Sequence, residues 1–187
     1  MKKVLFLLLA SVIVIFASCN TDSNGVNNVN ESVESLNLTT EVEVIDGDFV
    51  YRLVTEKDEY EEHGDVTIYA ELEYIGEKDN ITINHAASPF YFDIHEITRN
   101  YTIHHAVDTP LFSTILHKGE PYREVYIKAG GYSEHDEDDY IQFLIEFWDY
   151  GFPTGEYVVE GVADFFTEDN ENVNHLIEGK ISFTVVE

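Results

Sequence analysis

The chain has 187 residues, and 10 Lys and Arg stand against 37 Asp and Glu, for a formal charge of −27 at pH 7. This imbalance argues against nucleic acid as a partner, because phosphate backbones are bound by Lys and Arg that displace their counterions. A hydrophobic fraction of 44%, with 12 Tyr, 12 Phe and 1 Trp, excludes wholesale disorder, since such side chains fill a core. The single cysteine excludes an intrachain disulfide.

The first segment is typical of a targeting signal. Lys2 and Lys3 precede residues 4–16, a run of thirteen uncharged and mostly apolar residues. That run is too short for a hydrocarbon core of about 30 Å, which takes roughly 20 residues, but it matches the apolar part of a signal peptide. We therefore predict a signal peptide over residues 1–18.

The segment Phe16-Ala17-Ser18-Cys19 resembles the bacterial lipobox, in which two small residues precede a cysteine that becomes lipidated. The resemblance implies a diacylglyceryl thioether on Cys19 and a palmitate-type anchor on the extracytoplasmic side of the cell membrane. Two acyl chains give stable anchoring, since each buried methylene contributes about 0.8 kcal/mol. The alternative is an ordinary secretory signal with an incidental cysteine.

Residues 19–40 are rich in Asn, Ser and Thr and contain no aromatic residue. Such a segment buries too little apolar surface to offset the entropy of ordering, so we predict a flexible tether after the lipidated cysteine. The alternative is that residues 33–38 join the fold as an edge strand.

Residues 41–187 have the pattern of a single all-β domain. Apolar residues alternate with polar ones over short segments, and turn signals recur about every 8–12 residues, as in a sandwich or barrel. The expected inward positions are, in chain order, Val66, Ile68, Ala70, Leu72, Tyr74, Phe90, Phe92, Ile94, Tyr101, Ile103 and Val107. Further strands are expected within residues 122–128, 140–148, 157–165 and 181–185. Residues 141–147 fit a short helix as well as a strand, because periodicity alone cannot separate the two in so short a run.

Three motifs carry a family resemblance: residues 60–68 (YEEHGDVTI), residues 118–120 (KGE) and residues 152–159 (FPTGEYVV). Gly64 is expected to make the turn that begins a strand, and Gly155 to allow a tight turn into the next. Tyr157 is expected to tie that corner to upstream backbone through its hydroxyl, as a tyrosine corner does. In this order, the motifs resemble the Ig-like domain of the Bacillus intracellular proteinase inhibitor family over roughly residues 50–165. The resemblance implies an Ig-like antiparallel β-sandwich, and with it proteinase inhibition as an alternative function, although no protease-binding loop is identified.

Two groups of residues are candidate metal ligands. In residues 133–139 (SEHDEDD), Asp136, Asp138 and Asp139 offer carboxylates to Ca²⁺, but they lack the spacing of a calcium loop, and a solvated acidic loop is the interpretation that we favour.

The second group of candidate metal ligands consists of histidines. The chain holds His63, His85, His95, His104, His105, His117, His135 and His175. Four of them, His85, His95, His104 or His105, and His117, lie on consecutive predicted strands and could line up across a sheet, although no HxH or HExxH spacing supports zinc. The alternative is that they are surface histidines bonded to neighbouring residues.

Catalytic motifs such as G-x-S-x-G, the phosphate-binding loop and G-x-G-x-x-G do not occur in the sequence, so we expect no enzyme and no cofactor. The expected function is that of a lipid-anchored extracytoplasmic lipoprotein whose sandwich binds an unknown protein or wall ligand. The alternatives are a proteinase inhibitor-like domain and a Ca²⁺- or Zn²⁺-binding surface domain. A contiguous exposed patch built from Phe90, Tyr91, Tyr101 or Trp148 would mark the binding face.

Overall fold

The computed structural model describes residues 39–106 and 108–187, which contain eleven strands and one helix. The first strands are β1 (Glu41–Asp46), β2 (Phe49–Thr55), β3 (Glu59–Glu61), β4 (Ile68–Tyr74), β5 (Asn80–His85) and β6 (Phe90–Glu96). The remaining elements are β7 (Tyr101–Ile103), β8 (Phe112–His117), β9 (Tyr122–Val125), α1 (Asp138–Tyr150), β10 (Gly155–Thr167) and β11 (Asn170–Val186).

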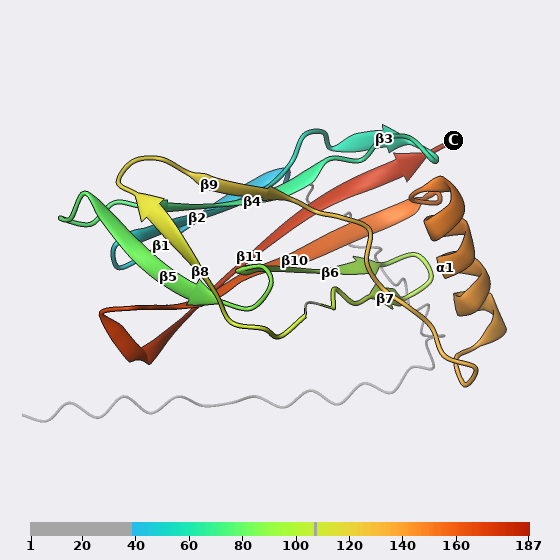
Figure 1. Cartoon of the computed structure of the whole chain (residues 1–187). Helices are drawn as coiled ribbons and strands as arrows, with labels where there is room; N and C mark the ends of the chain where they lie inside the picture. Colours follow the sequence, from blue (N-terminus) through green and yellow to red (C-terminus); the bar gives the residue numbers. More distant parts are fainter. Residues whose placement is uncertain (1–38, 107) are drawn as a thin grey trace, which may run out of the picture. The chain divides into compact units, whose positions relative to one another are not determined.

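The strands form two sheets that pack face to face as a sandwich (Figure 1). The smaller sheet has the order β1-β2-β4-β9, and the larger has the order β3-β11-β10-β5-β8, with β6 also pairing β10 and β7 pairing β6. The predicted all-β sandwich is therefore confirmed. The larger sheet is mixed, because the chain crosses from β2 to its edge and there lays β3 parallel to β11.

Alternation along the strands places the predicted apolar positions in the core between the sheets. On β4, Ile68, Ala70, Leu72 and Tyr74 are all buried. Most inward residues predicted on β6 and β7 are buried in the same way, namely Phe90, Phe92, Ile94 and Ile103. Three predictions fall elsewhere: Val66 precedes β4 and is half-buried, Tyr101 on β7 is half-buried, and Val107 lies outside the described residues.

Helix α1 decides the alternative left open for residues 141–147 in favour of a helix. Its buried residues Phe143, Leu144 and Phe147, with the half-buried Tyr140, recur at the i, i+3, i+4, i+7 spacing of one helix face. That face packs on the aromatic residues at one end of the sandwich, where Phe147 contacts Phe152 at a ring-centroid distance of 5.0 Å (Figure 1). A strand would have turned Leu144 and Phe143 to opposite sides and exposed one of them.

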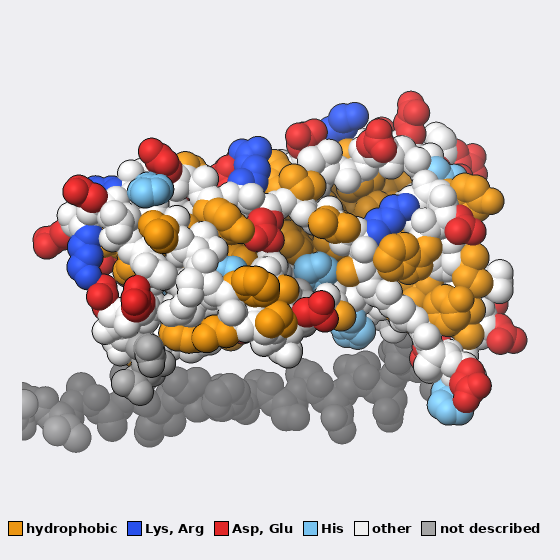
Figure 2. All heavy atoms as spheres, viewed as in Figure 1, with side chains coloured by type: hydrophobic (Ala, Val, Ile, Leu, Met, Phe, Trp, Pro, Cys, Tyr) orange, Lys and Arg blue, Asp and Glu red, His pale blue; other side chains and the backbone are white. Residues whose placement is uncertain are grey.

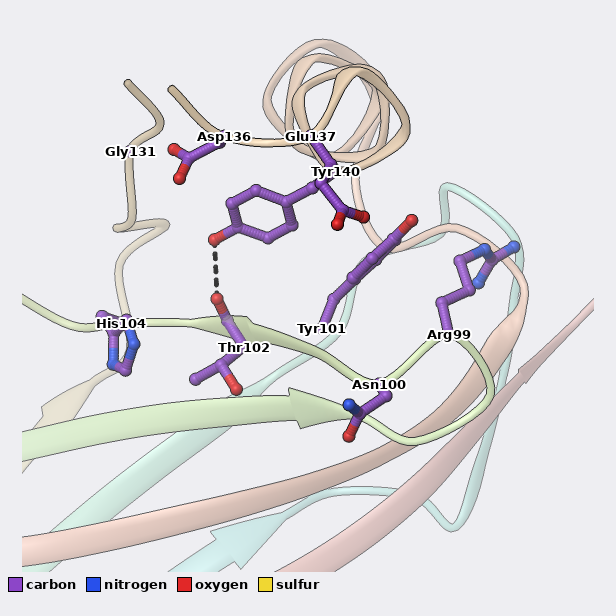
Figure 3. A pocket seen from close by; sticks show the side chains of 9 residues that line it. All are labelled: Arg99, Asn100, Tyr101, Thr102, His104, Gly131, Asp136, Glu137 and Tyr140. Atoms are coloured by element: carbon purple, nitrogen blue, oxygen red, sulfur yellow. Dashed lines mark hydrogen bonds between the residues drawn. The ribbon is translucent and has the colours of Figure 1, made fainter. Parts of the chain in front are cut away.

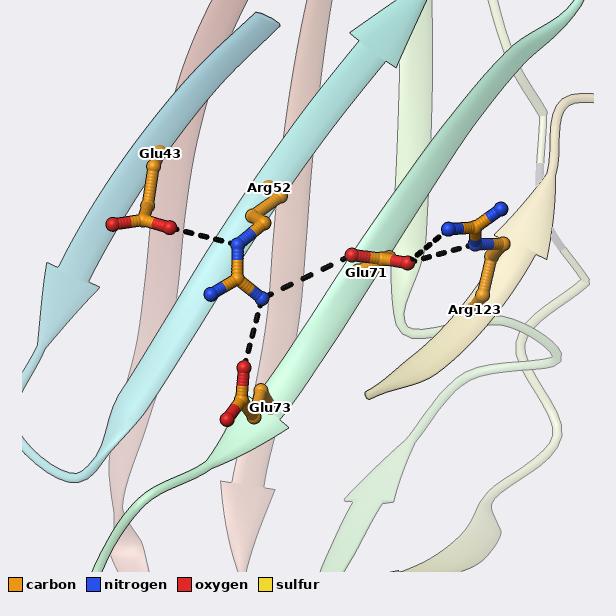
Figure 4. Close-up of polar contacts among 5 residues, drawn as sticks. All are labelled: Glu43, Arg52, Glu71, Glu73 and Arg123. Carbon is orange, nitrogen blue, oxygen red and sulfur yellow. Dashed lines mark hydrogen bonds and ion pairs between the residues drawn. The ribbon is translucent and has the colours of Figure 1, made fainter. Parts of the chain in front are cut away.

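The outer face of the smaller sheet carries a row of alternating charges (Figure 4). Glu43, Arg52, Glu71 and Arg123 are successive cross-strand neighbours on β1, β2, β4 and β9. The Arg52 Nε donates to the Glu43 Oε2 at 2.7 Å, and the Arg123 Nε donates to the Glu71 Oε1 at 2.7 Å. Opposite charges placed directly across a sheet stabilise it modestly, so this row favours the observed register of the four strands.

The domain extends at least to Thr39, earlier than the predicted boundary at residue 41. Thr39 and Thr40 were assigned to the tether, yet the Ser182 N–H donates to the Thr39 carbonyl at 2.9 Å and the Thr55 N–H to the Thr40 carbonyl at 2.8 Å. Backbone pairing of this kind leaves no hydropathy signal, because it does not depend on the side chain. The predicted signal peptide (residues 1–18), Cys19 and the rest of the predicted tether lie outside the described residues.

Candidate functional site

A groove opens at the helical end of the sandwich, between β7 and the start of α1, with a volume of about 660 Å³ (Figure 3). We call it the β7–α1 groove. Its lining residues are Arg99, Asn100, Tyr101, Thr102, His104, Gly131, Asp136, Glu137 and Tyr140.

The wall from the larger sheet is held by a buried carboxylate. Glu96 ends β6 and is fully buried, and its two oxygens accept the N–H groups of Thr98 at 3.0 Å and Arg99 at 2.7 Å. These bonds shape the turn from β6 to β7, in which Asn100 adopts a left-handed φ of 59° that asparagine tolerates better than most residues. The turn thereby presents Arg99 and Asn100 at the mouth of the groove.

The opposite wall comes from the loop before α1 and from its first turn. The Tyr140 hydroxyl donates to the Thr102 carbonyl at 2.7 Å (Figure 3). The Tyr140 ring contacts the Tyr101 ring, with a centroid-to-centroid distance of 5.3 Å. Partial burial and the nearby charge of Asp136 both raise the pKa of Tyr140, so its hydroxyl remains a donor at neutral pH. One hydrogen bond and one ring contact thus join the two walls at the base of the groove.

The charges around the groove are mixed. Arg99 and His104 lie on the sheet side, and Asp136 and Glu137 lie on the helix side (Figure 3). Arg99 is partly committed, because its Nη1 donates to the Thr154 carbonyl at 2.9 Å. The remaining groups offer donors and acceptors next to two aromatic rings, which suits a polar ligand of small net charge.

The three aspartates considered as Ca²⁺ ligands, Asp136, Asp138 and Asp139, have different structural roles. Asp138 and Asp139 lie in the first turn of α1, where their negative charge interacts favourably with the helix dipole. Asp136 closes the preceding turn, since its Oδ2 accepts the Ser133 N–H at 2.6 Å. Within the described part of the chain, these three carboxylates belong to no group of three ligating atoms that converge within 4.8 Å.

The histidines proposed to line up across a sheet are not brought together. His85 and His117 occupy opposite ends of the β5–β8 pairing, and His95 on β6 lies opposite Thr102. His104 contacts Asp93, with a distance of 3.4 Å between Nδ1 and Oδ2. His105 packs between the rings of Phe92 and Tyr126, and this burial lowers its pKa. The positions of the strands in the sequence do not reveal this separation. It follows from the register of β5 with β8, which pairs His117 with Asn80 and His85 with Phe112.

The three predicted structural residues lie where the motifs placed them. The Gly64 N–H donates to the Glu61 carbonyl at 2.9 Å and closes the turn that leads toward β4. A Cβ on Gly155, the first residue of β10, would lie 2.4 Å from the Glu96 carboxylate that shapes the groove. The Tyr157 hydroxyl donates to the Pro153 carbonyl at 2.7 Å, so the predicted bond to upstream backbone is confirmed.

The proposed aromatic patch cannot form as a whole, because Phe90 is fully buried and Tyr91 and Tyr101 are half-buried. Trp148 is exposed on α1. Exposed apolar side chains occur instead around β8, at Leu111, Phe112 and Ile115. On the face of the molecule seen in Figure 2, hydrophobic side chains are interspersed with polar and acidic groups. Leu111 also lines a concave site of about 570 Å³, which is smaller than the β7–α1 groove.

Comparison with known proteins identifies no relative: no protein-family model and no curated protein matches the chain. The resemblance to the proteinase inhibitor family therefore depends on the three motifs alone. Among the described residues, no helix is both long and apolar enough to cross a membrane.

Sequence reasoning did not identify Arg99, Asn100 or Tyr140 as site residues. The adjacent Arg99 and Asn100 are a turn signal that can be read from the sequence, but their partners in the groove come from α1, about forty residues further along. Their proximity follows from the tertiary contact between Tyr140 and β7.

Proposed function

We propose that this protein is a lipid-anchored extracytoplasmic lipoprotein, that its β-sandwich is a binding module, and that the β7–α1 groove is its ligand site. The anchor is supported by the lipobox-like Phe16-Ala17-Ser18-Cys19, in which the chain's single cysteine occupies the position that lipidation requires. The binding function is supported by the groove.

The observation that carries the proposal is the convergence of polar and aromatic groups in one concave site. A volume of about 660 Å³ lies within the range of about 300–1,000 Å³ that is usual for small-molecule sites. Asn100 and His104 offer side-chain donors and acceptors, and Tyr101 and Tyr140 offer ring surface. Buried bonds from Glu96 hold one wall in place, so the site is largely formed before the ligand arrives.

The charges of the groove favour a neutral ligand rich in hydroxyl or amide groups, and we propose an uncharged saccharide. An anionic ligand would meet Asp136 and Glu137 and the field of a protein of charge −27, which repels it. A strongly cationic ligand would meet Arg99. A saccharide matches the mixed donors and acceptors, and its C–H faces can pack on the tyrosine rings.

The groove is tested with the purified full chain against neutral wall-derived and synthetic oligosaccharides, with binding followed by isothermal titration calorimetry. We expect Asn100→Gly and His104→Ala each to weaken binding about tenfold, the effect of one lost hydrogen bond of roughly 1.4 kcal/mol. Glycine suits the left-handed φ of Asn100, so Asn100→Gly leaves the backbone unstrained. His117→Ala, an exposed histidine on β8, is the matched control and leaves affinity unchanged. Equal affinity in all variants would show that the groove is not the site.

The anchor is tested in cells by fractionation of the wild-type chain and of Cys19→Ser. We expect the wild type in the membrane fraction and the variant in the soluble extracytoplasmic fraction, because the serine hydroxyl forms no thioether. A Cys19→Ser variant that stays with the membrane would contradict lipid anchoring at this residue.

A further inference from the structure

Three ligating side chains meet at a second place, on the loop between β3 and β4. Glu62 and His63 follow β3 directly, and Glu146 projects from α1. One ligating atom from each of these residues lies within 4.8 Å of the other two, and the His63 Nε2 is 3.1 Å from the Glu146 Oε1. Within the described residues, this is the group of three potential metal ligands that the fold brings together.

The loop that carries two of these ligands is fixed by its own backbone bonds. The Glu62 N–H donates to the Val186 carbonyl at 2.7 Å, and the His63 N–H donates to the Phe152 carbonyl at 3.1 Å. The loop is thus docked at once on the end of β11 and on the segment that follows α1. The ligands are held in position by groups that a metal ion would not replace.

Two further features hold the side chains near one another. His63 adopts a left-handed φ of 60°, and its backbone lies against Gly151, which follows α1 with a φ of 119° that favours glycine. The Glu62 Oε1 accepts the Thr154 N–H at 3.0 Å, which orients that carboxylate and leaves its second oxygen for another partner.

The charge at this cluster is uncompensated. Among the described residues, neither Glu62 nor Glu146 forms an ion pair with Lys or Arg, and the ion pair of Glu146 is with His63. The carboxylates of the smaller sheet differ, because Arg52 and Arg123 form ion pairs with them (Figure 4). The nearby Lys128 donates its Nζ to the Phe147 and Trp148 carbonyls at the end of α1. Lys128 lines the cavity beside His63 but forms no ion pair with Glu62 or Glu146 among the described residues. Two carboxylates and an imidazole that converge in this way have the donor set of a cation site.

We propose that Glu62, His63 and Glu146 bind Zn²⁺. One imidazole and two carboxylates are a three-ligand zinc set with an open fourth position, whereas Ca²⁺ takes six to eight oxygens and little imidazole. Ligand atoms around a tetrahedral zinc lie roughly 3–3.5 Å apart, so small rotations of the two glutamate side chains complete the geometry. His63 also lines a cavity of about 430 Å³ with Tyr126 and Tyr150, which has room for a water. The ion would join the β3–β4 loop to α1, and the site is independent of the β7–α1 groove.

The test is titration of the purified, metal-stripped full chain with ZnCl₂, read by competition with a chromophoric zinc indicator and by the shift of the melting temperature. We expect one Zn²⁺ per chain and a higher melting temperature when zinc is bound, because the ion binds the folded state.

Three variants remove one ligand each: His63→Asn, Glu62→Gln and Glu146→Gln. Asparagine tolerates the left-handed φ of His63, and glutamine at residue 62 still accepts the Thr154 N–H, so the fold is preserved and circular dichroism verifies it. Each variant is expected to lower the zinc affinity at least tenfold and to abolish the melting-temperature shift. His135→Asn, which changes a histidine in the acidic loop with an 86% exposed side chain, is the matched control and binds as the wild type does. No saturable zinc binding, or binding that survives all three variants, would overturn the proposal.

Discussion

At the scale of single residues, two buried tyrosines show that the contribution of a hydroxyl to stability depends on its hydrogen-bond partner. Tyr157 and Tyr51 are both fully buried, and burial raises the pKa of each, so both hydroxyls stay protonated. The Tyr157 hydroxyl donates to the Pro153 carbonyl at 2.7 Å. The Tyr51 hydroxyl has no hydrogen-bond partner among the described residues. The same chemical group is therefore satisfied in one sheet and unsatisfied in the other.

Changing each tyrosine to phenylalanine separates these two situations. We expect Tyr157→Phe to lower the free energy of unfolding by about 1–2 kcal/mol, because a buried carbonyl loses its donor. We expect Tyr51→Phe to leave stability unchanged or to raise it slightly, since it removes a polar group buried without a bond. Urea unfolding followed by fluorescence measures both, and similar losses in the two variants would contradict the assignment.

At the scale of elements, the β10–β11 hairpin sets how closely the two sheets approach. Gly161 and Gly179 are direct cross-strand partners in this hairpin. A Cβ on Gly161 would lie 2.5 Å from the Tyr51 Oη, and one on Gly179 would lie 2.7 Å from the Val42 Cγ1. Glycine inside a strand commonly marks such a close approach of a neighbouring segment. Because the paired glycines have no side chains, residues of the smaller sheet pack directly against the β10–β11 backbone at this point.

A methyl group at this contact is expected to be costly. Gly161→Ala should lower the free energy of unfolding by about 1–3 kcal/mol, the usual effect of overpacking a filled core. Gly131→Ala is the control, because a Cβ there meets no atom within 4 Å. Thermal and urea unfolding of both variants provide the measurement. If Gly161→Ala were as stable as Gly131→Ala, the two sheets would accommodate the added methyl group without a loss of stability, which would contradict this prediction.

At the scale of the whole molecule, the main electrostatic feature is the excess of acidic residues. The charge of −27 acts against the compact state, while the cross-strand ion pairs of Arg52 and Arg123 act locally in its favour. The surface pairs contribute little individually. The excess of 37 acidic over 10 basic residues leads us to propose that the protein comes from saline or alkaline surroundings.

The balance predicts that salt stabilises the fold. Raising NaCl from 0.01 M to 1 M shortens the screening length from about 30 Å to about 3 Å, which removes long-range repulsion more than contact pairs. We therefore expect the melting temperature to rise with NaCl, as measured by differential scanning calorimetry. The Arg52→Gln variant, which leaves Glu43 and Glu73 without their guanidinium partner, should be less stable than the wild type and most so at low salt. A melting temperature that stays constant or falls as salt is added would contradict the repulsion argument and the saline origin.

Local chemistry was sufficient for much of this description. Strand alternation at Ile68–Tyr74 and Phe90–Ile94 identified the core faces, and the motif around Tyr157 identified its corner bond, because these features depend on neighbours along the chain. The lipobox-like Cys19 is likewise a local signal, and it remains a prediction. The helix over residues 141–147 was left open, since its packing on Phe152 rather than its own period decides it.

The sites were decided only by the tertiary structure. Tyr140 reaches β7 and Glu146 reaches His63 because α1 packs against one end of the sandwich, and no spacing in the sequence encodes either contact. The acidic loop and the histidines on consecutive strands, which the sequence offered only as candidate ligands, are separated by the start of a helix and by strand register. The sequence by itself determined which residues face the core, since that depends on hydropathy at a local period, whereas convergence of distant side chains depends on how whole elements dock.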